Sequence, residues 1–437
     1  MTNTRKLRLT ALCGLLLCAA LLLCACAGRT ADDPQAEPAA AAEPTPEATP
    51  VPTPEPTPVP DVTILGQTYK ADAREVDLSG ITDEDVPAVV EALGQMEAVE
   101  SLIVGDDKTT PLTWDSMTAL HEAAPDAVID YAFTLFKKNF NLSDEEMDLK
   151  YVRMDDEGAL VSQVAHCMTK LRFLDMDSCE VSNEAMAELR DSLPQAEVVW
   201  RVNFGRFYTA RTNVTKILAS MPGKAGELVH NNVMALQYCT KVKYLDLGHN
   251  NFLDTIEFCR YMPDLEVLIV GMTFVEDFSP LENCPKLEYL EAMTSRLHDL
   301  TPLSNLKNLR HLNICFDFAV TDISPLYNLT ELERLWIGAQ VPVPPEQIEK
   351  MQEMAPNCVI NVTALDPTEE GWRTVDYGTE VPNSTIAARY LLLKQQFGYK
   401  EEDFSYQWND PLYDARWHPP EVEPDDVPDF VFYPDVS

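Results

Sequence analysis

The stretch Val242-Lys-Tyr-Leu245-Asp-Leu247 decides the fold, because its aliphatic residues follow an L-x-x-L-x-L pattern that the chain repeats. Successive copies begin 23, 22, 22 and 23 residues apart. A repeat of roughly 20–29 residues with this pattern is typical of a solenoid in which each repeat contributes one short strand. The later copies are Leu265-Glu-Val-Leu268-Ile-Val270, Leu287-Glu-Tyr-Leu290-Glu-Ala292, Leu309-Arg-His-Leu312-Asn-Ile314 and Leu332-Glu-Arg-Leu335-Trp-Ile337.

A second motif lies between these copies. It reads Asp277-Phe-Ser-Pro-Leu281, Asp299-Leu-Thr-Pro-Leu303 and Asp322-Ile-Ser-Pro-Leu326. A Ser or Thr before Pro predicts a helix start, since the hydroxyl can cap free N–H groups and proline suits the first helical position. Each repeat is therefore expected to hold one strand and one helical turn.

These two motifs, over roughly residues 242 to 340, resemble the leucine-rich repeats of bacterial internalins, which carry a similar D-[IL]-[ST]-P-L segment. The resemblance implies an α/β fold, a leucine-rich repeat solenoid. Parallel strands would line its concave face, and helices or helical turns would lie on its convex face. It also implies that the concave face recognises proteins.

Weaker copies extend the array toward the N-terminus, and we expect the repeat domain to cover residues 61–365. Leu171-Arg-Phe-Leu174-Asp-Met176 fits the pattern, and further copies are expected to begin at Val76, Val99, Val128, Leu149 and Val199. Apolar residues at helical spacing predict full helices around 86–93 and 186–193. Three prolines, at 125, 194 and 356, each predict a helix end before a strand. No pattern is visible over residues 205–241, which indicates either a distorted repeat or an inserted helix-rich loop.

The N-terminus carries a targeting segment, residues 1–26. Basic residues precede an apolar centre, as in an export signal, and Leu23-Cys24-Ala25-Cys26 resembles the lipobox of bacterial lipoproteins. The resemblance implies lipidation of Cys26 and an extracytoplasmic protein tethered to the cell membrane or cell surface; the alternative is an uncleaved membrane helix. Residues 27–60 are rich in Pro, Ala, Glu and Thr, which predicts a disordered linker. Residues 366–437 break the repeat and are expected to form a cap, with a helix near Leu393, and an acidic tail.

The composition argues against several functions. With 33 Lys and Arg against 71 Asp and Glu, the net charge is -38, so nucleic acid is not an expected partner. Four of the eleven cysteines lie in the targeting segment. Of the other seven, Cys239 and Cys284 occupy positions typical of core fillers, and because no C-x-x-C follows the targeting segment we expect free or occasionally paired structural cysteines. No G-x-S-x-G or H-E-x-x-H is present. We therefore expect no catalysis, no metal and no cofactor, and we read Asp175-Met-Asp177-Ser-Cys-Glu180 as a solvated face rather than a calcium loop.

The remaining candidate is a stripe along the expected strands. Side chains alternate along a strand, so positions two, four and six after each anchor should project from the same face. They mix aromatic rings with carboxylates, which favours a protein partner. A cell-wall or other glycan is an alternative ligand for an envelope protein, and a hydrolase site in the tail, near Trp372, Trp408 and His418, is a third hypothesis. The candidate binding residues are Phe173, Asp175, Tyr244, Asp246, Ile269, Tyr289, Glu291, His311, Asn313, Arg334 and Trp336.

Overall fold

The computed structural model describes residues 59–205, 208–220, 228–368, 371–373, 393, 397 and the strand 430–432. The chain divides into two compact units, and all of these residues belong to the second, residues 58–437. The expected targeting segment with Cys26, and the linker up to residue 58, lie outside the described residues. In the part of the chain that the structure describes, no helix has the length and apolar character that crossing a membrane requires.

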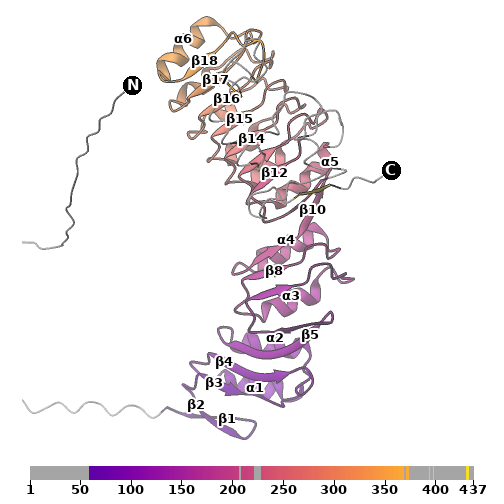
Figure 1. Ribbon diagram of the computed structural model, residues 1–437. Coiled ribbons are helices and arrows are strands. Elements are labelled where there is room, and N and C mark those ends of the chain that lie inside the picture. Colours follow the sequence, from indigo (N-terminus) through magenta and orange to yellow (C-terminus); the bar gives the residue numbers. More distant parts are fainter. Residues whose placement is uncertain are drawn as a thin grey trace, which may run out of the picture. The chain divides into compact units, whose positions relative to one another are not determined.

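A seven-stranded parallel sheet contains the strands of the five L-x-x-L-x-L copies and one further strand at each end. This sheet confirms the leucine-rich repeat solenoid (Figure 1). The middle residues of five neighbouring strands are leucines, all fully buried, and they pair in register from Leu245 to Leu335. Burial of one leucine per coil gives the array a continuous core. The strands are β12 (Lys216–Leu218), β13 (Tyr244–Asp246), β14 (Val267–Ile269), β15 (Tyr289–Glu291), β16 (His311–Asn313), β17 (Arg334–Trp336) and β18 (Val359–Asn361).

Short helical turns connect these strands. They are η2 (Glu257–Tyr261), η3 (Ser279–Asn283), η4 (Thr301–Leu303) and η5 (Ser324–Asn328). The expected capping by the Ser or Thr hydroxyl is wrong at the three D-x-[ST]-P-L motifs, because that residue is already inside the turn. The aspartate two positions earlier accepts its N–H instead, over 2.8 Å at Asp277, 2.8 Å at Asp299 and 2.9 Å at Asp322.

The N-terminal half uses full helices, as the spacing predicted, but its strands do not join the seven-stranded sheet. One sheet has the order β3-β4-β5-β6 and another the order β7-β8-β9. The elements are β3 (Glu75–Asp77), α1 (Val86–Leu93), β4 (Ser101–Asp106), α2 (Trp114–Ala123), β5 (Val128–Leu135), β6 (Lys138–Asn141), β7 (Glu146–Asp148), α3 (Ala159–His166), β8 (Phe173–Asp175), α4 (Asn183–Ser192) and β9 (Glu197–Val199). Helix α6 (Pro345–Met354) ends, like α2 and α4, just before its proline.

Antiparallel hairpins interrupt the array at regular intervals. The hairpins are β1 (Asp61–Ile64) with β2 (Gln67–Lys70), β5 with β6, and β10 (Arg201–Phe204) with β11 (Tyr208–Arg211). Each is followed by a parallel strand, and these three strands begin at Glu75, Glu146 and Lys216, which are 71 and 70 residues apart. The chain therefore has a longer repeat of one hairpin plus a block of strands. Strand β19 (Phe430–Phe432) pairs with β11.

The hairpins correct several of the expected registers. The copies expected to begin at Val76, Val128, Leu149 and Val199 are out of register. The residues that pair at the core positions of these strands are Val76, Ile129, Met147 and Val198. Residues 205–241 contain a true repeat strand, since Ile217 pairs with Leu245. Both alternatives for that stretch hold in part: a hairpin precedes the strand, and α5 (His230–Val233) and η1 (Met234–Tyr238) follow it.

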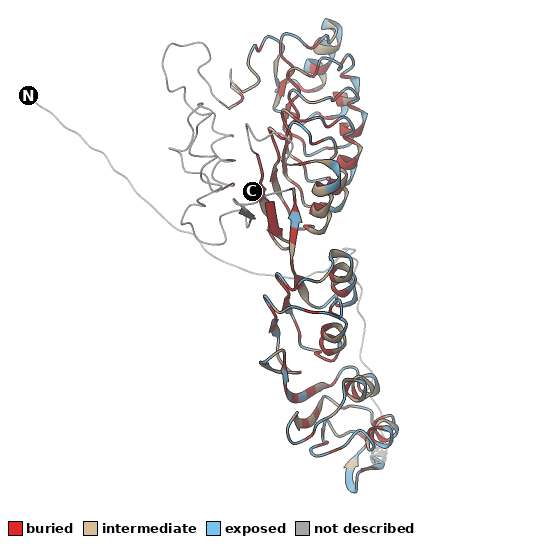
Figure 2. Cartoon of the chain, turned by 90° about the vertical axis from the view of Figure 1, so that its right-hand side faces the viewer, coloured by how far each residue is buried: buried red, intermediate tan, exposed pale blue. Residues whose placement is uncertain are grey.

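The seven described cysteines are free and buried, as expected for core fillers. Figure 2 shows buried residues recurring along the coils of the array. Burial raises the pKa of Cys239 and of Cys284 to about 12, so these thiols stay protonated. They contribute apolar packing and not a nucleophile.

A candidate binding face on the seven-stranded sheet

The first and third residues of the strands β12 to β18 form a second face, opposite the leucine core. We call this side the strand face; it corresponds to the concave face expected from the sequence. Nine of the eleven candidate residues lie on it, distributed over β13 to β17. Phe173 and Asp175 lie on β8, in a different sheet. The structure therefore brings most of the expected site together and separates these two residues from it.

Six of the nine residues are buried, although they were expected to project outward for a partner. Ala364, Trp372, Leu393 and Phe397 pack with the sheet in a second apolar cluster, separate from the leucine core. Residues beyond the last strand thus cover the face that the pattern predicted to be open. The exposed fractions are Ile269 4%, Tyr289 0%, Glu291 0%, His311 5%, Asn313 0% and Trp336 2%; Tyr244, Asp246 and Arg334 are half-buried.

Glu291 is the centre of this covered region. Its side chain is fully buried, and Trp372 donates its indole N–H to Oε1 over 2.7 Å. Arg373 donates Nε to the same oxygen over 3.1 Å and its Nη2 to Oε2, while the Tyr289 hydroxyl also donates to Oε1. Burial by itself raises the pKa of this carboxyl, but Arg373 and the hydrogen bonds hold the pKa of Glu291 below its usual value. Glu291 and Arg373 thus form a buried, hydrogen-bonded ion pair.

Trp372 occupies an aromatic slot on the same face. Its ring centroid lies 5.2 Å from that of Tyr289, 5.5 Å from Trp336 and 6.5 Å from His311. The Arg334 guanidinium lies 4.4 Å from the Trp372 ring centroid, within cation–π range. With the tryptophan fully buried, the slot closes around it.

The main chain of the covering segment is also recognised. Arg334 Nη1 donates to the carbonyls of Gly371 (2.7 Å) and Trp372 (2.8 Å), and Asn313 donates to the carbonyl of Pro367 over 2.7 Å. Gly371 has a φ of 98°, a conformation that glycine adopts without the cost a side chain would add. The strand face therefore holds a turn, Gly371–Arg373, by its backbone, its aromatic ring and its charge.

Asp175 and Asp177 form a separate charged cluster beside the hairpin β10-β11. Arg201 binds Asp177 with two nitrogens, Nε at 2.9 Å and Nη2 at 2.8 Å, and Arg211 donates to Asp175 over 2.9 Å. Both aspartates are 2% exposed, so the reading of this stretch as a solvated face is wrong. The arginines come from a hairpin that the sequence pattern did not predict. Among the described residues, no group of three His, Cys, Asp or Glu side chains could hold a metal ion.

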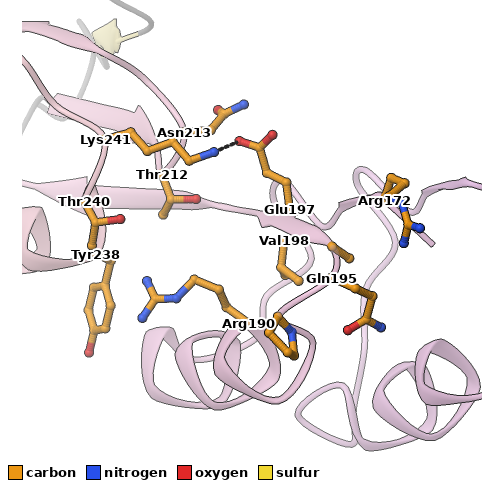
Figure 3. Close-up of a pocket in the computed structure, with 12 residues that line it drawn as sticks. Arg172, Arg190, Gln195, Glu197, Val198, Thr212, Asn213, Tyr238, Thr240 and Lys241 are labelled. Atoms are coloured by element: carbon orange, nitrogen blue, oxygen red, sulfur yellow. Dashed lines mark hydrogen bonds and ion pairs between the residues drawn. The ribbon is translucent and has the colours of Figure 1, made fainter. Parts of the chain in front are cut away.

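A cavity of about 390 Å³ lies between α4, β9 and the residues after η1 (Figure 3). None of the candidate binding residues lines it. Lys241 in its wall is paired with Glu197 over 2.5 Å, and Arg190 pairs through Nε with Asp191 over 2.9 Å and lies 5.6 Å from the Trp200 ring. Both cations are engaged in ion pairs and none of the expected binding residues lies here, so we take the strand face as the candidate site.

Sequence reasoning missed Trp372 and Arg373 as parts of this face. They lie in a segment that breaks the repeat, so no register connects them with Glu291. The one available signal is a tryptophan, a residue that is usually well buried, within a polar stretch. The expected tail helix falls mostly outside the described residues; the N–H of Phe397 donates to the carbonyl of Leu393 over 2.9 Å, as in a helical turn.

No protein-family model and no curated protein matches the sequence. Among solved structures, the chain is similar to internalin C2 of Listeria monocytogenes, with 16% identity, 52% of this chain and 86% of that chain covered, and a TM-score of 0.29. It is similar to the internalin InlF of the same species, with 16% identity over 69% and 86% of the chains and a TM-score of 0.31. A leucine-rich repeat protein of Leptospira interrogans has 14% identity over 62% and 74%, with a TM-score of 0.31. The fold is established here by the repeats and the sheet themselves.

Proposed function

We propose that the chain is an exported, lipid-anchored leucine-rich repeat protein that recognises a short segment of a protein partner through its strand face, without catalysis. The observation that carries this proposal is the way the face holds Gly371–Arg373. It supplies donors to main-chain carbonyls, an aromatic slot and a buried counter-charge. Buried aromatic and arginine anchors are the contacts that dominate protein recognition.

The partner segment should present an aromatic residue followed by a basic one. Glu291 is fully buried with Arg373 as its cation, so a ligand without a positive charge would leave that carboxylate unpaired. The slot of Tyr289, His311 and Trp336 fits a ring of indole size. In the conformation described, the chain's own segment fills the site, so a partner enters by displacing it.

A synthetic peptide of residues 366–376 tests this proposal. The full chain carrying Trp372→Ala and Arg373→Ala has an empty site, so it should bind the labelled peptide, measured by fluorescence anisotropy. The wild type should bind it far more weakly, because a tethered segment competes at an effective concentration on the order of millimolar. A peptide with Ala in place of the tryptophan should bind the variant at least about tenfold more weakly, which corresponds to about 1.4 kcal/mol.

The controls separate loss of the site from loss of the fold. Tyr151→Ala removes a 77% exposed aromatic side chain and should leave the wild-type behaviour unchanged. Adding Glu291→Gln to the emptied variant should abolish peptide binding while circular dichroism stays the same. Equal binding of the tryptophan and alanine peptides would refute recognition by the aromatic slot.

Export and anchoring are supported by the sequence of residues 1–26. Cells expressing the full chain should incorporate labelled palmitate into the protein, and Cys26→Ala should abolish the label. Persistent labelling of the Cys26→Ala chain would contradict anchoring at that residue. Two or more acyl chains would make the attachment stable where a single chain gives only reversible binding.

A further inference from the structure

Three phenylalanines and one arginine occupy the same place in four successive coils. Phe252, Phe274, Arg296 and Phe318 are each 22 residues apart, and each lies five or six residues after the end of its strand, β13, β14, β15 or β16. We call these four residues the rim ladder. They belong neither to the leucine core nor to the strand face.

The phenylalanines of the ladder are exposed, with exposed fractions of 52% for Phe252, 40% for Phe274 and 56% for Phe318. The Phe252 and Phe274 ring centroids lie 6.1 Å apart, and the Arg296 guanidinium lies 4.1 Å from the Phe274 ring centroid. Single exposed aromatics are ordinary, but exposed rings in contact on adjacent coils, continued by an arginine on the next coil, mark an interaction surface.

The ladder stands on a fixed backbone. The N–H of Phe274 donates to the carbonyl of Leu253 over 2.7 Å, and the N–H of Arg296 donates to that of Val275 over 3.0 Å. Asp317, 1% exposed, accepts from both the N–H and the hydroxyl of Ser295, which ties the third coil to the fourth. A partner that docks here therefore meets preformed contacts and orders little of the chain.

Carboxylates border the ladder. Asp254 and Glu276 have side chains 56% and 63% exposed, and Asp277 and Asp299 are exposed as well. The nearest side-chain nitrogens to the first two belong to His230, 3.6 Å from Asp254, and His298, 3.9 Å from Glu276. Arg296 is the one permanent cation of the ladder itself. The surface is thus apolar in its centre and acidic at its border.

These features favour one occupant. The rings of Phe252 and Phe274 are inclined at 63°, so they form no flat platform on which a sugar could stack. Two segments outside the described residues, 27–58 and 398–429, hold more Asp and Glu than Lys and Arg, and a second copy would likewise bring acidic borders together. Like charges at an interface are unfavourable. We infer that the rim ladder docks a segment of another protein that presents apolar and basic side chains together.

Three labelled peptides on the full chain test this inference. The first is an amphipathic peptide of Leu and Lys, the second has Glu in place of Lys, and the third has Ser in place of Leu. The first should bind, and more weakly as the NaCl concentration rises, because exposed charges contribute. The second and third should bind at least about tenfold more weakly, equivalent to about 1.4 kcal/mol. Equal binding of the first and third peptides would overturn the inference.

A variant with Phe252→Ser, Phe274→Ser and Phe318→Ser locates the site. It should lose at least about tenfold in affinity for the Leu/Lys peptide, while Tyr151→Ser, which removes an aromatic side chain of 77% exposure, should lose nothing. Unchanged affinity in the triple variant would overturn the assignment, as would wild-type self-association in sedimentation that the triple variant abolishes.

Discussion

The pair of Arg373 and Glu291 offers the sharpest test of how the strand face is filled. Arg373→Ala leaves a fully buried carboxylate with two uncharged donors, Tyr289 and Trp372. Removing one partner of a buried ion pair costs about 3–5 kcal/mol. Glu291→Gln should cost less, because Arg373 is 17% exposed and can turn toward water. The coupling energy in a double-mutant cycle should therefore be about 2 kcal/mol.

Denaturant unfolding of the full-length single and double variants measures this coupling, and hydrogen exchange at Arg373, whose N–H donates to Thr368 over 2.7 Å, follows the segment itself. The contribution should depend on pH. Since the folded state lowers the pKa of Glu291 from its usual 4.5, the stabilisation is present above about pH 4.5 and is lost as the pH falls through the lower folded pKa. A coupling under about 0.5 kcal/mol, the usual limit of additivity, would refute the contact.

Three further perturbations test the array. Leu290→Ala, at a fully buried core position, should destabilise the array by about 2–5 kcal/mol in denaturant unfolding; a loss under about 1 kcal/mol would contradict the stacked core. Burial raises the pKa of Asp317 to about 8, so the free energy of unfolding of the wild type should fall by up to about 1.4 kcal/mol per pH unit between roughly pH 4 and 8. The urea midpoint should fall with it, and Asp317→Asn should remove most of this pH dependence. If the stability of Asp317→Asn changes with pH as steeply as that of the wild type, another group causes the pH dependence. Asp322→Ala removes the acceptor for the Ser324 N–H and should lower the free energy of unfolding by about 1 kcal/mol. Ser324→Ala keeps that hydrogen bond and should lower it less. A larger loss for Ser324→Ala than for Asp322→Ala would show that the serine hydroxyl caps the turn after all.

The sequence was sufficient to predict the five central strands of the seven-stranded sheet, β13 to β17. Leucines such as Leu268 and Leu290 recur at nearly constant spacing, and coils of one length must stack in one register. The helices α1 and α4 followed from their own periodicity. Periodicity did not predict the hairpins, because the side chains of their strands alternate on a two-residue period that the L-x-x-L-x-L pattern does not share. The 71- and 70-residue spacing of β3, β7 and β12 is the signal that could have located them.

The composition of the binding face was predictable, but its coverage was not. Tyr289, Glu291 and Trp336 were assigned to one face by strand alternation, and they do lie together. What covers them lies 81 residues beyond Glu291, at Trp372, and no local pattern encodes that distance. A buried carboxylate among aromatic residues was itself a hint, since a burial of this kind requires a cation from elsewhere in the chain.

Fluorine NMR of the full chain labelled with 5-fluorotryptophan tests the central claim most directly. The chain has six tryptophans, and Trp372→Phe assigns the resonance of interest. If the segment fills the slot, Trp372 is fully buried, and its fluorine signal should not move when H₂O is replaced by D₂O. A solvent shift as large as that of free fluorotryptophan would show that the strand face is empty and would contradict the account.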